Sequence, residues 1–135
     1  MVQSIEKLWE YLDYFANQVD GRKVNKAVME YMENQDNISM WATNREYDCA
    51  EIADDFHDVE PSGHIIRISV ADGRLLTPFT VLEYKNLVQY QYHTVYVKND
   101  LVYDPRMWMK PLKKEDYEKM LRHLNPGIHF HFEMD

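Results

Sequence analysis

The chain has 135 residues, a formal net charge of −8 and 45% hydrophobic residues. This length fits one domain that can bury a core, and the composition is not that of a disordered protein. The acidic balance argues against nucleic acid as a partner, because a phosphate-binding surface needs clustered Lys and Arg. No apolar run approaches the ~20 residues of a membrane span, which argues against a membrane partner. We therefore expect a cytoplasmic protein, or a module exported within a larger protein and delivered to a target-cell cytosol.

The first third of the chain is expected to be helical and to carry no chemistry of its own. Apolar residues follow a helical spacing over 5–19 and again over 24–32. The polar segment "ENQDN" (33–37) is typical of a loop.

A third helix, predicted over 48–58, has the best-marked start in the chain. Asp48 suits the N-cap, and Glu51 three residues later completes a capping box. Cys49, the single cysteine, therefore takes the first helical position. Unpaired N–H groups and the helix dipole favour a thiolate there. A single thiol can form neither an intrachain disulfide nor a Cys-based metal site.

The middle of the chain is predicted to form strands. Residues 64–71 alternate between apolar and polar, whereas 74–84 is ambiguous because Pro78 interrupts it. The segment 87–98 is the longest β signal, and 101–104 returns as the second arm of a hairpin.

The C-terminal part is expected to hold a helix over 113–124, with Tyr117 inward, and a strand over 128–134. His129 and His131 alternate with apolar residues and are best explained as a solvated face, so we expect no metal site. The predicted order of elements is helices first, then strands, then a helix and a last strand. This order predicts an α+β domain with an antiparallel sheet.

The hairpin holds the most informative pair. Asn99-Asp100 is typical of a two-residue loop, which would set Val95 opposite Asp104. His93 lies two residues from Val95 and shares its side of the sheet, so the two polar side chains can meet. Valines accompany them, so we expect this to be the buried, helix-facing side. An imidazole and a carboxylate buried there are costly unless they satisfy each other.

The helix that starts at Cys49 is expected to pack on the same side of the sheet. Its apolar residues are Cys49, Ile52, Ala53 and Phe56. A thiol, an imidazole and a carboxylate brought together can perform nucleophilic catalysis, because the base activates the thiol and the carboxylate orients the base. The alternative is a non-catalytic binding protein, such as an immunity protein or adaptor, in which Cys49 is a core residue and His93–Asp104 a structural pair.

Three segments carry a resemblance to a known family: "DCAEIADDF" opening a helix, "YHTVYV" on a strand and "VYDP" on the next. In this order they resemble the papain-like fold, and more narrowly the papain-fold toxin domains at the C-terminal ends of bacterial polymorphic toxins. The resemblance covers 45–106, which would be the catalytic core of a single domain over 1–135. Residues 1–44 would be its helical N-terminal part and 107–135 its C-terminal helix and strand.

The resemblance implies Cys49 as nucleophile, His93 as general base and acid, and Asp104 as the orienting acid. Relatives attack amides or esters as peptidases, glutamine deamidases or transferases. Papain-like peptidases place a Gln a few residues before the Cys, where this chain has "WATNREYDC" with Asn44 as the substitute. Asn44 and the backbone N–H of Cys49 are thus the expected oxyanion donors. A thiol hydrolase or deamidase of this kind needs no cofactor, acts on a protein substrate and, as a toxin module, would have a cognate immunity protein.

Overall fold

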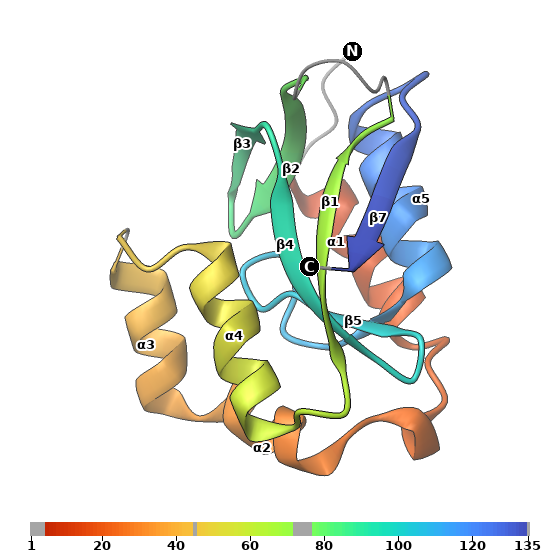
Figure 1. The fold of residues 1–135 in the computed structure, drawn as a ribbon. Helices are drawn as coiled ribbons and strands as arrows, with labels where there is room; N and C mark the ends of the chain where they lie inside the picture. The colour runs from red at the N-terminus through yellow and green to blue at the C-terminus, as the bar shows by residue number, and fades with distance from the viewer. Residues whose placement is uncertain (1–4, 45, 72–76, 135) are drawn as a thin grey trace.

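The computed structural model describes residues 5–44, 46–71 and 77–134, which form an α+β arrangement with antiparallel sheets (Figure 1). The helices are α1 (Ile5–Ala16), α2 (Lys26–Glu33), α3 (Gln35–Thr43), α4 (Cys49–Val59) and α5 (Lys114–Leu124), with a 3-10 turn η1 at Gly21–Lys23. The strands are β1 (His64–Val70), β2 (Phe79–Glu83), β3 (Asn86–Tyr90), β4 (His93–Lys98), β5 (Leu101–Tyr103), β6 (Leu112–Lys113) and β7 (Phe130–Met134). Within the described ranges, no helix combines the length and apolarity needed to cross a bilayer.

Five strands form one antiparallel sheet in the order β6-β5-β4-β1-β7, and β2 and β3 form a separate two-stranded hairpin. The prediction of a single strand over 87–98 is therefore wrong, because this segment forms β3 and β4. The chain leaves the β ladder at Gln91 and Tyr92, so that the two halves of this apolar run belong to different sheets. Alternation alone does not reveal such a change of sheet.

The helices predicted over 5–19, 24–32, 48–58 and 113–124 are confirmed with shifted ends, as are strands within 64–71, 101–104 and 128–134. Of the ambiguous segment 74–84, residues 79–83 form β2, and 74–76 lie outside the described residues.

The loop predicted over 33–37 is wrong, because α3 begins within it. Asn34 supplies the N-cap, and its Oδ1 accepts hydrogen bonds from the backbone N–H groups of Asp36 and Asn37. A polar run can thus be the start of a helix as well as a loop.

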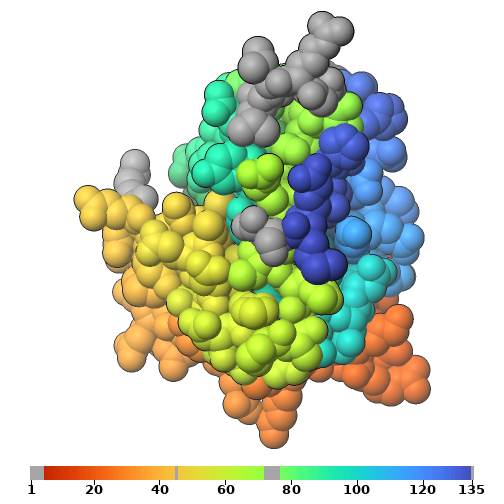
Figure 2. Space-filling model, viewed as in Figure 1, coloured from red at the N-terminus to blue at the C-terminus, as the bar shows by residue number. Residues whose placement is uncertain are grey.

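The five-stranded sheet has a buried core on each face. The face of Val95, Val97 and Val102 packs with α1 and α5, whereas that of Tyr96, Leu101 and Tyr103 packs with α2, α3 and α4. In the space-filling view, the yellow α3–α4 region and the dark blue β7 strand cover different parts of the visible side (Figure 2).

The expectation that α4 packs on the face of His93 is wrong. Ile52 and Phe56 of α4 pack against Tyr96 and Tyr103, on the opposite face of the sheet. The valine face is already covered by α1 and α5, so the aromatic face is the one left for α4.

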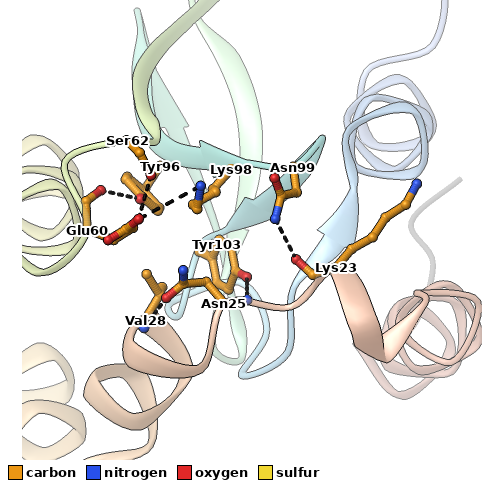
Figure 3. Close-up of polar contacts among 9 residues, drawn as sticks. All are labelled: Lys23, Asn25, Val28, Glu60, Ser62, Tyr96, Lys98, Asn99 and Tyr103. Carbon is orange, nitrogen blue, oxygen red and sulfur yellow. Dashed lines mark hydrogen bonds and ion pairs between the residues drawn. The ribbon is translucent and has the colours of Figure 1, made fainter.

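The β4–β5 hairpin has the two-residue loop that its sequence predicts. Asn99 and Asp100 have φ values of 53° and 63°, as a tight type I′ turn requires, and Lys98 pairs with Leu101 across the loop. The Asn99 amide also donates to the carbonyl of Lys23 at 3.1 Å, which fixes the turn to η1 (Figure 3).

On its aromatic face, the hairpin is tied to two helix ends by tyrosine hydroxyls (Figure 3). Tyr103 accepts a hydrogen bond from the backbone N–H of Asn25, the N-cap of α2, at 3.0 Å. Tyr96 donates to the carbonyl of Glu60, the C-cap of α4, at 2.5 Å. Gly63 allows this close approach, because a Cβ there would lie 2.2 Å from the Tyr96 oxygen.

Candidate functional site

The predicted His–Asp pair is formed. His93 is the first residue of β4, and Asp104 follows the last residue of β5. The His93 Nε2 atom lies 2.8 Å from Asp104 Oδ2, and the two side chains are only 1% and 9% exposed. The even register of the hairpin thus brings the imidazole and the carboxylate to one face, as expected.

Asp104 is held at the point where the chain leaves the sheet. Its main-chain carbonyl accepts hydrogen bonds from the N–H groups of Met107 and Trp108, at 3.1 and 3.0 Å, which close a turn directly after β5. Its Oδ2 also accepts a second hydrogen bond, from the Tyr117 hydroxyl of α5, at 2.7 Å. The sequence predicts only that Tyr117 faces inward, since a helical spacing does not show which polar atom a hydroxyl will meet.

Each member of the His93–Asp104 pair stabilises the charged form of the other. Burial favours the uncharged imidazole, but the charge and hydrogen bond of Asp104, with a smaller effect from Cys49, raise the pKa of His93 to about 10. Burial likewise favours the uncharged carboxyl, yet the charge of His93 and hydrogen bonds from His93 and Tyr117 hold the pKa of Asp104 below its usual value. The favoured state is therefore an imidazolium beside a carboxylate.

Cys49 occupies the first position of α4, as predicted, and is half-buried. The capping box is present: Asp48 accepts from the Glu51 N–H at 2.9 Å, and Glu51 accepts from the Asp48 N–H at 3.4 Å. The Sγ atom accepts a hydrogen bond from the backbone N–H of Thr94 at 3.4 Å.

The sulfur lies at the open edge of β4, against Thr94, the residue after His93, and not on the expected face. The β4–β5 pairing ends at Tyr96 opposite Tyr103, so the edge of Thr94 lies beyond the end of β5 and is open to the sulfur. Because Nε2 of His93 is bound to Asp104, Nδ1 is the nitrogen left for the thiol. Nδ1 is buried and has no hydrogen-bond partner among the described residues.

Two hollows adjoin the site. A cavity of about 10 Å³ is lined by Cys49 and Asp104, and a larger cleft of about 530 Å³ is lined by Glu83 and Tyr90. Arg106 lines both. The Tyr90 ring, which lines the larger cleft, stacks on the imidazole of His93, with centroids 5.6 Å apart and planes at 12°.

Arg106 joins the two halves of the site, and its role was not predicted. It is 8% exposed, and its guanidinium donates to the carbonyls of Trp41 at 3.2 Å, Asn44 at 3.2 Å and Tyr47 at 2.5 Å. These bonds tie the segment before Cys49 to the turn after β5. The sequence offers no signal for this, because carbonyl acceptors have no side-chain signature.

Asn44, the predicted oxyanion donor, is the exposed C-cap residue of α3. Its Oδ1 accepts a hydrogen bond from the N–H of Glu46 at 3.1 Å, within the segment that leads to Cys49. The role of Asn44 at an oxyanion stays a prediction.

Comparison of the chain with protein-family models, with curated proteins and with solved structures gives no match in any of the three. A function can therefore be inferred only from the geometry of Cys49, His93 and Asp104.

Proposed function

We propose that the protein is a papain-like thiol enzyme that attacks a protein amide, with Cys49 as nucleophile, His93 as base and acid, and Asp104 as the orienting acid. One observation carries the proposal. A buried imidazole has one ring nitrogen bound to a carboxylate and the other without a partner among the described residues, and a thiol at a helix N-terminus is bound to the next residue of the strand, close enough to act on the imidazole. Each group has the neighbour that nucleophilic catalysis by a thiol needs.

The chemistry proceeds in two halves. In the reactive form the thiol proton resides on His93, and the Cys49 thiolate beside this imidazolium attacks the amide carbon, forming a C–S bond. Collapse of the tetrahedral intermediate breaks the C–N bond, and His93 gives its proton to the departing amine or ammonia. Water, deprotonated by His93, then hydrolyses the thioester and restores the thiol.

The proposed substrate is a glutamine side chain or a peptide bond, which would enter from the cleft that Tyr90 lines. The oxyanion would be bound by the Cys49 N–H and the Asn44 amide. On the resemblance, the setting is a bacterial toxin or effector module that acts in a target-cell cytosol and is neutralised by a cognate immunity protein.

The single cysteine permits a direct test. The rate of alkylation by iodoacetamide reports Cys49 alone and can be followed by mass spectrometry over a range of pH. We expect the folded protein to react at about pH 6 at least ~10-fold faster than the chain in urea, and His93→Ala to lose this advantage. His64→Ala, a change of an exposed histidine on β1, is the matched control and should behave as wild type. A rate that His93→Ala leaves unchanged contradicts the proposal.

A second candidate function, a non-catalytic binding protein, is favoured by one observation. The cavity at Cys49 is only about 10 Å³, and the sulfur already accepts a hydrogen bond from Thr94. The same experiment separates the two, because a thiol that serves only as packing stays inert while the protein is folded.

A further inference from the structure

We propose that Tyr117 is a positioning residue of this site, and that its hydroxyl fixes the Asp104 carboxylate in the orientation that directs His93 toward Cys49. The inference rests on the proposed function and adds a fourth residue to it. The Tyr117 hydroxyl donates to Asp104 Oδ2 at 2.7 Å, and the side chain is 1% exposed.

Two donors from different elements meet on one carboxylate oxygen. His93 Nε2 reaches Oδ2 from β4 at 2.8 Å, and the Tyr117 hydroxyl reaches it from α5 at 2.7 Å. With His93 as the sole side-chain donor, the carboxylate could rotate about its Cβ–Cγ bond and tilt the imidazole with it. The second donor removes this freedom, because α5 is packed on the same core as the hairpin.

The second donor also favours the charged carboxylate. Burial alone favours the neutral acid, which would supply no charge to hold an imidazolium. Hydrogen bonds to an ionised group are stronger than those between neutral groups. Tyr117 thus helps Asp104 to stay ionised, and through it helps His93 to stay protonated.

The groups around the phenol favour its protonated, donating form. Burial raises the pKa of Tyr117 well above its usual value, and the negative charges of Asp104 on the hairpin, Cys49 on α4 and Glu83 on β2 act in the same direction. His93 is the cation that faces the same carboxylate. The hydroxyl is therefore a donor throughout the pH range in which the thiol would react.

The test is the pH profile of Cys49 alkylation in Tyr117→Phe, which keeps the ring and removes only the hydroxyl. We expect the acid limb of the profile to move upward by roughly 0.5–1 pH, with a ~3–10-fold lower rate at about pH 6. The matched control is Tyr103→Phe, which removes a buried, hydrogen-bonded hydroxyl from the opposite face of the sheet and should leave the profile unchanged.

A second variant does not depend on losing a hydrogen bond. Replacing Tyr117 with 3-fluorotyrosine makes the phenol a stronger donor, and we expect the acid limb to move downward. A purely structural tyrosine gives no such opposite response to the two changes.

The outcomes separate this inference from the function on which it rests. If both Tyr117 variants follow the wild-type profile while His93→Ala shifts it, the inference is overturned and the thiol enzyme stands. If Cys49 is inert in the wild-type protein, or if His93→Ala leaves its rate unchanged, the proposed function fails and the inference fails with it.

Discussion

The two faces of the β4–β5 hairpin use buried polar groups in different ways. On one face, the side chains of His93 and Tyr117 both bind the carboxylate of Asp104. On the other, the hydroxyls of Tyr96 and Tyr103 bind main-chain groups at helix ends. Main-chain partners do not titrate, so the aromatic face attaches helices, whereas the His–Asp face can change its charge. A single hairpin thus separates attachment from proton transfer.

The largest expected effect concerns the His–Asp face. In any assay of amide attack, Cys49→Ala should abolish activity and His93→Ala should nearly do so, because the thiol is lost or loses its base. Asp104→Asn keeps the shape and weakens only the support of the imidazolium, so its loss should lie between ~10-fold and ~10⁴-fold. Full activity in both the His93 and the Asp104 variants would contradict the assignment.

On the aromatic face, the largest effect should be on stability. Phe56 is fully buried and contacts Trp41, Tyr96 and Tyr103. Phe56→Ala should lower the free energy of unfolding by about 3–5 kcal/mol, measured by urea denaturation, because it leaves a cavity under α4. A loss below ~1 kcal/mol would show that α4 is not held through this side chain.

The His–Asp face should make stability depend on pH. Since the pKa of His93 is raised in the fold from 6.5 to about 10, its contribution is fully present below about 6.5 and is lost as the pH rises through about 10. Asp104→Asn removes the charge responsible, so the free energy of unfolding should decline less steeply between about pH 6.5 and 9.5 than in wild type. Parallel curves for the two proteins would exclude this coupling.

A smaller effect is expected where β4 meets the end of α4. A Cβ at residue 63 would lie 2.2 Å from the Tyr96 oxygen and 2.3 Å from its ring, so Gly63→Ala must displace one of the two. We expect a loss of about 1–3 kcal/mol in unfolding free energy. Gly21→Ala is the control, because nothing lies within 4 Å of the added methyl. Because the ring carbon is also too close, adding Tyr96→Phe should not restore stability.

The smallest effect should follow from Tyr103→Phe. It removes the acceptor of the Asn25 N–H and should cost about 1 kcal/mol by urea denaturation. Cys49 alkylation should not change. An altered alkylation rate would show that the two faces are coupled, against the separation described above.

The features that the sequence predicted correctly depend on residues that are close together along the chain. The turn preference of Asn99-Asp100 sets the register, and the register alone brings His93 beside Asp104. The capping box of Asp48 and Glu51 places Cys49 at the start of its helix. These are contacts over a few residues, for which side-chain type is sufficient information.

What the sequence did not predict depends on distant contacts. The face on which α4 packs is decided by which helices already cover the valines, and alternation along β4 does not contain that information. The contacts of Arg106 with three carbonyls and of Tyr117 with Asp104 join segments that no pattern relates. They appear only when the chain is folded.

The two-residue turn also has a consequence for the order of assembly. His93 and Asp104 are 11 positions apart in the chain, whereas the contact of Cys49 with Thr94 spans 45. Short loops close sooner and at a lower entropic cost than long ones. A refolding or newly made chain should therefore form the imidazole–carboxylate pair early and gain its thiol last, when α4 docks on the tyrosines. The sulfur would then behave as an ordinary thiol until folding is complete, which limits attack on other proteins by the unfinished chain.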